Sequence, residues 1–221
     1  MADITGYNPA QAEQDINNFT EAYQAADIIL QNAMGDFVDE LSTKWYSPKA
    51  VEFWHFYVAE RTNILTLITR TEWIILSNSV ASYNILARSN GAPTMDNPYT
   101  SWASSTNPML FTSSRGDPAF KEVSENGAVG MNTLAVKSML IPLLVEGVNR
   151  SMEAFIDLPT NIAFYDPAGE LQAKFKELIK NMVEQIRTEM GNILDKLKTD
   201  LEDEVENITL AKEAATETLN A

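Results

Sequence analysis

The side chain best suited to chemistry in this chain is its single histidine, His55. Glu52 and His55 have the Glu-x-x-His spacing with which helices hold metal in di-iron bundles. A di-iron site needs two such motifs and two further carboxylates, and one histidine cannot supply the second motif. We therefore expect His55, which lies between two aromatic residues, to be a core or boundary residue.

A run of acids near the C-terminal end is the next candidate for a metal site. It lacks the glycine and the ligand spacing of a calcium loop. The sequence holds no Gly-rich phosphate loop, no HExxH motif, no nucleophile elbow and no cysteine. It therefore predicts no catalytic, cofactor-binding or metal-binding residue, and a protein that is not an enzyme. The acids of the run are Asp200, Glu202, Asp203, Glu204 and Glu206.

Charge narrows the class of partner. The 221 residues carry 31 acids against 16 Lys and Arg, a net charge of −15. Nucleic acids and anionic membrane surfaces are polyanions, so neither is an expected partner. Residues 1–43 hold eight acids and no Lys or Arg, and residues 200–221 hold seven acids against Lys212 alone. These two stretches are either solvated helix faces or surfaces for a basic protein partner.

No segment of the sequence looks like a leader or a membrane anchor. The N-terminal residues lack a basic region followed by an apolar one, which a signal peptide requires. The apolar run 64–76 contains Arg70 and Glu72, and 139–145 is too short to span a bilayer. We expect a soluble protein of unknown compartment, either part of a virion or exported without a cleaved leader.

The elements that must position any site are predicted to be helices. The first segment opens at Asn8-Pro9, and apolar residues then recur in steps of three and four from Ile16 to Leu41. The same steps run from Pro48 to about Arg88 and from Pro167 onward. A third segment opens at Asp117-Pro118, is weakened by Asn126-Gly127 and Gly130, and resumes at residues 132–156 with a kink at Pro142. Its expected inward side chains are Leu134, Leu140, Leu144, Val148, Met152 and Phe155.

The last helix is the longest, at roughly 50 residues or about 75 Å. It would outrun the helix against which it folds, so its end should project and need a partner. A break at Gly191 or a frayed acidic tail is the alternative. The fold class is thus all-α, with two tandem helical hairpins (1–90 and 117–221) that form an elongated four-helix bundle.

Residues 91–116 form a long irregular loop rich in Asn, Gly, Pro, Ser and Thr. Loops of this length inside compact proteins are usually functional or disordered. Four apolar residues in this polar segment should either contact a partner or pack over the bundle. They are Trp102, Met109, Leu110 and Phe111.

The two hairpin corners repeat one another. Trp45-Tyr46-Ser47-Pro48 follows the first helix, and Phe164-Tyr165-Asp166-Pro167 follows the third. Ser and Asp cap helices, and proline suits the first helical position. The aromatic pairs should wedge between helices at each turn, which predicts antiparallel hairpins. The expected corner and packing residues are Phe37, Trp45, Tyr46, Pro48, Phe155, Phe164, Tyr165 and Pro167.

Two long helices joined at a tryptophan corner resemble the WXG family of early secreted antigens, the helical-hairpin substrates of type VII secretion. The matching residues are Trp45-Tyr46-Ser47, with serine in place of the family's glycine. The resemblance implies two hairpins fused in one chain. The family's Tyr-x-x-x-Asp/Glu export signal matches only at Tyr23 to Asp27, inside the first helix. Acidic hairpins of this kind are also similar to small structural proteins of bacteriophage particles.

The sequence thus favours a non-enzymatic component of an assembly, either a bacteriophage virion component or a type VII-like exported hairpin protein. Its partners would be other protein subunits, including further copies of itself, and a basic protein surface. The alternative is a membrane-active effector whose aromatic helix, residues 53–76, inserts when the bundle opens. A metal or cofactor bundle is disfavoured by the ligand count.

Overall fold

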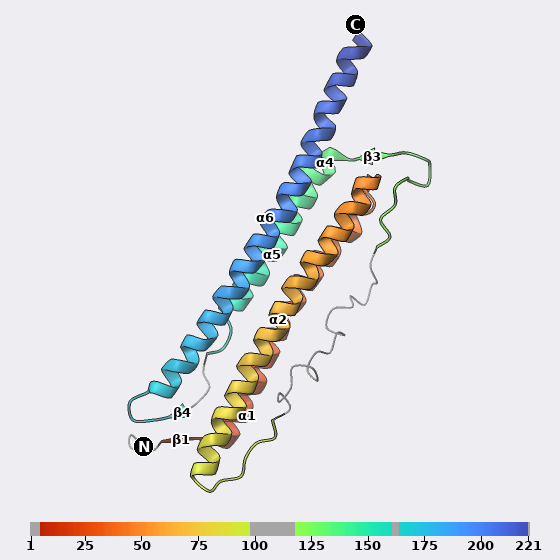
Figure 1. Ribbon diagram of the computed structural model, residues 1–221. Coiled ribbons are helices and arrows are strands. Elements are labelled where there is room, and N and C mark those ends of the chain that lie inside the picture. Colours follow the sequence, from red (N-terminus) through yellow and green to blue (C-terminus); the bar gives the residue numbers. More distant parts are fainter. Residues whose placement is uncertain (1–4, 98–117, 161–163, 221) are drawn as a thin grey trace. The chain divides into compact units, whose positions relative to one another are not determined.

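The computed structural model describes residues 5–97, 118–160 and 164–220, and in these residues the fold is all-α (Figure 1). The first two long helices are α1 (Pro9–Leu41) and α2 (Pro48–Ser89). A short α4 (Thr133–Ala135) and a π-helical segment, η2 (Val136–Leu140), lead into α5 (Ile141–Ile156). The last helix is α6 (Glu170–Asn220). The predicted all-α fold is confirmed.

The chain divides into two compact units. Unit 1 comprises Met1–Ile28, Leu65–Leu110 and Met152–Thr188. Unit 2 comprises Ile29–Ile64, Phe111–Ser151 and Glu189–Ala221. Each unit therefore draws on both predicted hairpins. The domain boundaries expected at 90/91 and 116/117 follow chain order and stay a prediction.

Among the described residues, four two-residue strands form one small antiparallel pair in each unit. In unit 1, β1 (Gly6–Tyr7) pairs with β4 (Phe164–Tyr165). In unit 2, β2 (Trp45–Tyr46) pairs with β3 (Gly130–Met131). Each strand lies just before the start of a helix. The pairing is symmetric between the two halves of the chain. In each half, the first strand pairs with the second strand of the other half. The repeat seen at the corners thus extends to the strand pairs.

Helices α1 and α2 begin at their prolines, as predicted. The Asn8 side-chain oxygen accepts hydrogen bonds from the N–H groups of Ala10 (3.1 Å) and Gln11 (3.2 Å). At α2, the Ser47 hydroxyl accepts from the N–H of Ala50 at 3.0 Å. These side chains satisfy N–H groups of the first turn that have no partner within the helix.

The start of α6 differs from the prediction. The helix begins at Glu170 and not at Pro167. Gly169 has a φ of 70°, a left-handed conformation that favours glycine, and it separates the Asp-Pro pair from the helix. Asp166 still caps the helix from a distance, because its Oδ2 accepts from the N–H of Leu171 at 2.8 Å.

The third helix also starts later than predicted. Asp117 lies outside the described residues, and residues 118–129 contain no helix. The chain turns at Ser124, whose hydroxyl accepts from the N–H of Ala128 at 2.9 Å, and Gly127 takes a φ of 77°. Helical structure begins only after Asn132, whose side chain accepts from the N–H of Ala135 at 3.0 Å.

Pro142 lies at the second residue of α5, directly after the π-helical segment. The N–H of Ile141 bonds to the carbonyl of Val136, five residues back instead of four. Proline has no N–H to donate, and its ring clashes with the carbonyl four residues before it. A π turn at this place widens the helix where that clash would occur, so the π-helical segment η2 accommodates Pro142.

Each unit has its own apolar core. In unit 1 the Tyr23 hydroxyl crosses from α1 to donate to the carbonyl of Ile68 on α2 at 2.7 Å. In unit 2 the Tyr57 hydroxyl crosses from α2 to donate to the carbonyl of Met34 on α1 at 2.8 Å. Both hydroxyls are buried, and these bonds replace the water they lose on folding.

Candidate docking groove between α4 and α6

The corner residues of unit 2 are packing residues. Phe37 and Trp45 are buried, and their rings contact those of Tyr57 (centroids 6.0 Å apart) and Phe53 (5.7 Å). Tyr46 is half-buried in β2, and Pro48 is exposed at the first position of α2. This corner therefore supports the fold and presents no reactive group.

The corner residues of unit 1 behave similarly. Phe155 is buried with its ring edge-on to Tyr23 at 5.1 Å, and half-buried Phe164 stacks on Tyr83 at 4.9 Å. Tyr165 and Pro167 are exposed. The loop residues expected to contact a partner lie outside the described residues; they are Trp102, Met109, Leu110 and Phe111.

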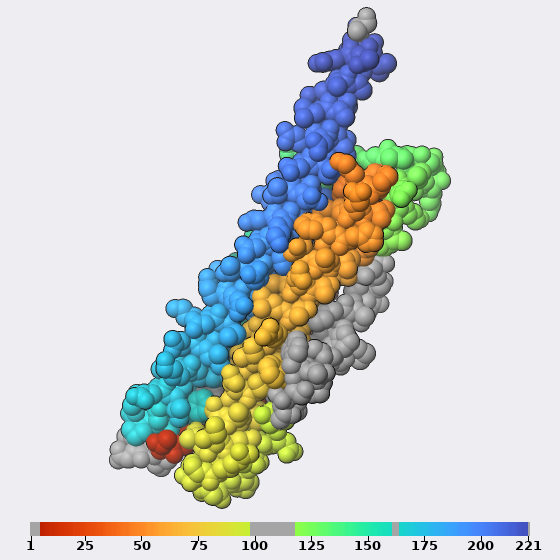
Figure 2. Space-filling view, in the orientation of Figure 1, coloured from red at the N-terminus to blue at the C-terminus, as the bar shows by residue number. Residues whose placement is uncertain are grey.

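The end of α6 is the most exposed part of unit 2. The helix is continuous through Gly191, which confirms the predicted long helix. Aligning the two corners places Ser89, the last residue of α2, opposite Ile208 of α6, so residues 209–220 have no counterpart in the first half. Every side chain from Glu206 to Asn220 is exposed or half-buried. Figure 2 shows this helix end uncovered on the face that is drawn.

An open groove of about 610 Å³ lies between the start of the third helical segment and α6. One wall carries Leu134, Lys137 and Ile141. Leu134 is 76% exposed, so the prediction that it points inward is wrong. Steps of three and four from Leu140 lead back to Val136, which is buried in its place.

The α6 wall of the groove carries Glu202, Val205, Glu206 and Leu210. Val205 is buried at the base of this wall, whereas Leu210 is 54% exposed. The groove is open because α6 continues past the first residue of α4 without a neighbouring helix among the described residues of unit 2. It thus presents two exposed leucines, one on each wall.

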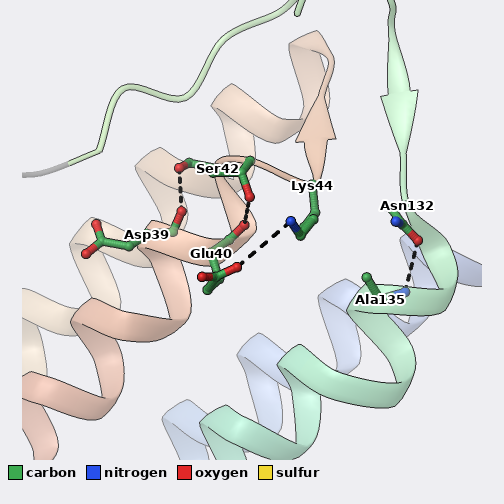
Figure 3. A network of polar contacts seen from close by, with 7 residues as sticks. Asp39, Glu40, Ser42, Lys44, Asn132 and Ala135 are labelled. Atoms are coloured by element: carbon green, nitrogen blue, oxygen red, sulfur yellow. Dashed lines mark hydrogen bonds and ion pairs between the residues drawn. The ribbon is translucent and has the colours of Figure 1, made fainter.

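The α4 wall is fixed by the β2–β3 pair (Figure 3). The N–H of Asn132 donates to the carbonyl of Lys44 at 2.8 Å, which ties the start of α4 to the first corner. The Ser42 hydroxyl donates to the carbonyl of Asp39 at 2.7 Å, and Lys44 lies 3.9 Å from Glu40. The Ser42 bond satisfies one carbonyl at the end of α1, and the Asn132 bond holds the α4 wall against this corner.

The α6 wall is held by two ion pairs to α2. The Lys49 ammonium lies 2.5 Å from Glu204, and the Lys196 ammonium lies 3.3 Å from Glu60. Exposed ion pairs contribute little to stability, so their main effect is to fix the direction of α6. Both pairs lie on the N-terminal side of the exposed helix end.

The groove is acidic along its α6 wall. Glu202 and Glu206 face it from one turn apart, and Lys137 is the cation of the opposite wall. One turn earlier on α6, partial burial raises the pKa of Asp200, and so does repulsion from Glu204 and Asp203. Carboxylates are therefore crowded on this part of α6, and a nearby cation would relieve their repulsion.

Sequence reasoning missed the groove because it treated the two walls separately. One signal was available. Leu210 lies five residues after buried Val205, outside the steps of three and four that predict one seam along α6. A leucine off the seam of an amphipathic helix indicates a second apolar surface.

Unit 1 contains a second group of titratable side chains. Burial, and to a smaller extent repulsion from buried Asp27, together raise the pKa of Glu72 from 4.5 to about 7. The pKa of the Tyr23 hydroxyl is also raised, mainly by burial and then by these two acids. The raised pKa of Glu72 makes the stability of the fold depend on pH.

His55 and Glu52 are both exposed on α2, so the prediction of a core or boundary histidine is wrong. Across residues 5–97, 118–160 and 164–220, no three His, Cys, Asp or Glu side chains are placed to hold a metal ion. None of the helices in these ranges has an apolar stretch long enough to cross a bilayer. Comparison of the chain with protein-family models, curated proteins and solved structures finds no match. The WXG resemblance therefore stays a prediction.

Proposed function

We propose that this chain is a non-enzymatic helical component of a larger protein assembly. The observation that carries the proposal is the exposed end of α6, where residues 209–220 extend the helix without covering neighbours. Isolated helices shorter than about 12–15 residues are marginal in water. The exposed Leu210 and Leu219 add apolar surface that a partner would cover. A bound subunit would stabilise this helix end.

Two versions of this function are compatible with the chain, a bacteriophage virion component and a type VII-like exported hairpin protein. The repeated corners and the twofold pairing scheme of the strands support a compact helical building block in either setting. Neighbouring genes distinguish the two versions. Capsid and tail genes favour the virion, and a secretion ATPase gene favours export.

The membrane-active alternative has less support. The side chains that it would insert, among them Phe53, Tyr57, Ile64 and Ile68, are buried in the cores of the two units. Dye release from liposomes at mildly acidic pH remains its direct test.

Sedimentation tests the assembly role. The full chain, in extract of the cells or particles that contain it, is expected to sediment with a complex much larger than its own 24.6 kDa. A chain that ends at Ile208 should lose only the helical signal of residues 209–220 in circular dichroism, because none of these side chains is buried, but should return to the monomer fraction. A full chain that sediments as a monomer would refute the proposal.

A further inference from the structure

We propose, on the basis of the assembly role above, that the groove between α4 and α6 binds an amphipathic helix of a different protein. The apolar face of that helix would lie between Leu134 and Leu210, and Lys or Arg residues would flank it. The shape of the groove, its apolar walls and its charge each specify one property of this occupant.

The shape of the groove specifies an elongated occupant. Its α6 wall does not stop at Leu210 but continues as exposed helix to Asn220. From Glu202 to Asn220 the helix rises about 27 Å, at about 1.5 Å per residue. A small molecule in the 610 Å³ groove would leave most of this wall uncovered. A helix laid along α6 would cover the whole of it.

The apolar walls specify the face of the occupant that enters. Leu134 and Leu210 are 76% and 54% exposed on opposite walls, and Ile141 and Val205 are buried beneath them. Binding of a helix in a groove uses apolar anchors at positions i, i+3, i+4 and i+7 of one helix face. Such anchors would remove both leucines from water.

The charge of α6 specifies the flanks of the occupant. Four carboxylates recur on α6 at steps of four, seven and four residues, which place them on one helix face, and the first two of them line the groove. Two lysines of α6 lie beside this acidic stripe: Lys212, and Lys198, whose ammonium is 3.9 Å from Glu202 at the N-terminal end of the stripe. Lys or Arg residues beside the apolar face of the occupant would pair with it. The stripe consists of Glu202, Glu206, Glu213 and Glu217, all exposed.

The same charge argues against a second copy of this chain as the occupant. Each copy carries a net charge of −15 and the same acidic stripe. Two such surfaces repel one another, and like charges across an interface select against that pairing. A basic segment of another protein is attracted to the stripe.

Site-specific photocrosslinking tests this inference in the full chain. Benzoylphenylalanine is placed at Leu134 or at Leu210, and, as a control, at Ile85, which is 64% exposed on α2 in unit 1. After irradiation of the native cells or particles, the crosslinked peptides are mapped by mass spectrometry. Both groove positions should join the same Lys- or Arg-flanked amphipathic segment of another protein, and Ile85 should not.

The other outcomes each have a definite meaning. Crosslinks to a second copy of this chain, or to a segment without flanking bases, would overturn the inference but leave the assembly role intact. The same holds if neither groove position crosslinks while the chain still sediments in a large complex. A chain that neither crosslinks nor sediments above monomer size would overturn both proposals.

Charge reversal separates ionic docking from mere proximity. Glu206→Lys with Glu213→Lys should lower the crosslink yield from Leu210 about tenfold, because two attractive pairs become repulsive. A matched control, Glu122→Lys with Glu153→Lys, changes the net charge equally at exposed residues outside the groove, and should change the yield by less than about twofold. Equal losses in the two variants would refute specific recognition by the acidic stripe.

Discussion

Replacing Gly147 of α5 by alanine should destabilise the protein, although alanine is the better helix former. An added Cβ at Gly147 would lie 2.2 Å from the Cβ and 3.4 Å from the Cα of Ala33 on α1. Carbon atoms in contact prefer separations of about 3.5–4.0 Å, so the two helices would have to part locally by about 1.5 Å. Gly147 is buried, and a close-packed interior resists this movement.

The magnitude follows from two opposing effects. Overpacking of a tight core costs typically 1–3 kcal/mol, and a clash between Cβ atoms on two helices belongs at about 3 kcal/mol. The gain in helix propensity from glycine to alanine is about 1 kcal/mol. Gly147→Ala should therefore lower the free energy of unfolding by about 2 kcal/mol, which lowers Tm by about 4–8 °C in a chain of this size.

Three further variants isolate the clash. Gly191 of α6 has no atom within 4 Å of an added Cβ, so Gly191→Ala should raise the free energy of unfolding by about 1 kcal/mol. Ala33→Gly alone should lower it by about 1 kcal/mol, because glycine weakens α1. In the double variant Ala33→Gly/Gly147→Ala the methyl group is moved from one helix to the other. This variant should recover nearly parental stability.

Denaturant unfolding followed by circular dichroism measures all four variants. The cycle of Ala33 and Gly147 should give a coupling free energy of about 3 kcal/mol, the cost of the clash. Strictly additive effects, or a Gly147→Ala variant as stable as Gly191→Ala, would refute the close contact between α1 and α5.

Three further predictions concern charge, packing and capping. Because folding raises the pKa of Glu72 from 4.5 to about 7, the folded state binds more protons between these values, and its stability falls as pH rises through them. Glu72→Gln should therefore match the parent at pH 4 and exceed it by about 3 kcal/mol at pH 8 in denaturant unfolding; equal stability at pH 8 would contradict this. Trp45→Ala should cost about 3–5 kcal/mol in the same assay, because Trp45 is buried against Phe53, and a loss below 1 kcal/mol would contradict its packing role. Ser47→Ala should cost about 1 kcal/mol and Ser47→Asp should cost little, since only the latter keeps a cap for α2; equal losses would exclude capping.

Much of the fold follows from local patterns in the sequence. Ile16, Phe19 and Tyr23 recur in helical steps, and all three are buried on α1. Asn8 and Ser47 stand directly before a proline, and both cap the helix that begins there. These features depend on residues within one or two turns of each other, so the sequence alone is enough to predict them.

Local sequence patterns gave wrong predictions where two neighbouring residues favour different structures. The pair Asp166-Pro167 resembles a helix start, but Gly169 delays α6 until Glu170. Leu134 has the apolar character of a core residue, but Val136 occupies the buried position instead. In both cases a neighbouring residue decided the structure. The start of α6 and the burial of Val136 could not be predicted from the type of Pro167 or Leu134 alone.

Some features of the candidate groove were likewise predictable from the sequence, and others were not. The sequence predicted the length of α6 and its acidic end, because both are properties of one continuous segment. The groove was not predictable, because its walls carry Leu134 and Leu210. These residues are too far apart along the chain for a local pattern to relate them. Likewise, the acid at Glu72 is visible in the sequence, but its raised pKa depends on burial beside Asp27.

The sequence by itself determined the four long helical segments, the caps of α1 and α2, the repeat of the two corners and the net negative charge. Only the tertiary structure decided that the strands pair as β1 with β4 and β2 with β3, and which side chains face the groove. The physical reason is how far apart along the chain the interacting residues lie. Helical hydrogen bonds and caps form between residues close in sequence, whereas strand pairing and burial depend on contacts between segments that are far apart in the chain.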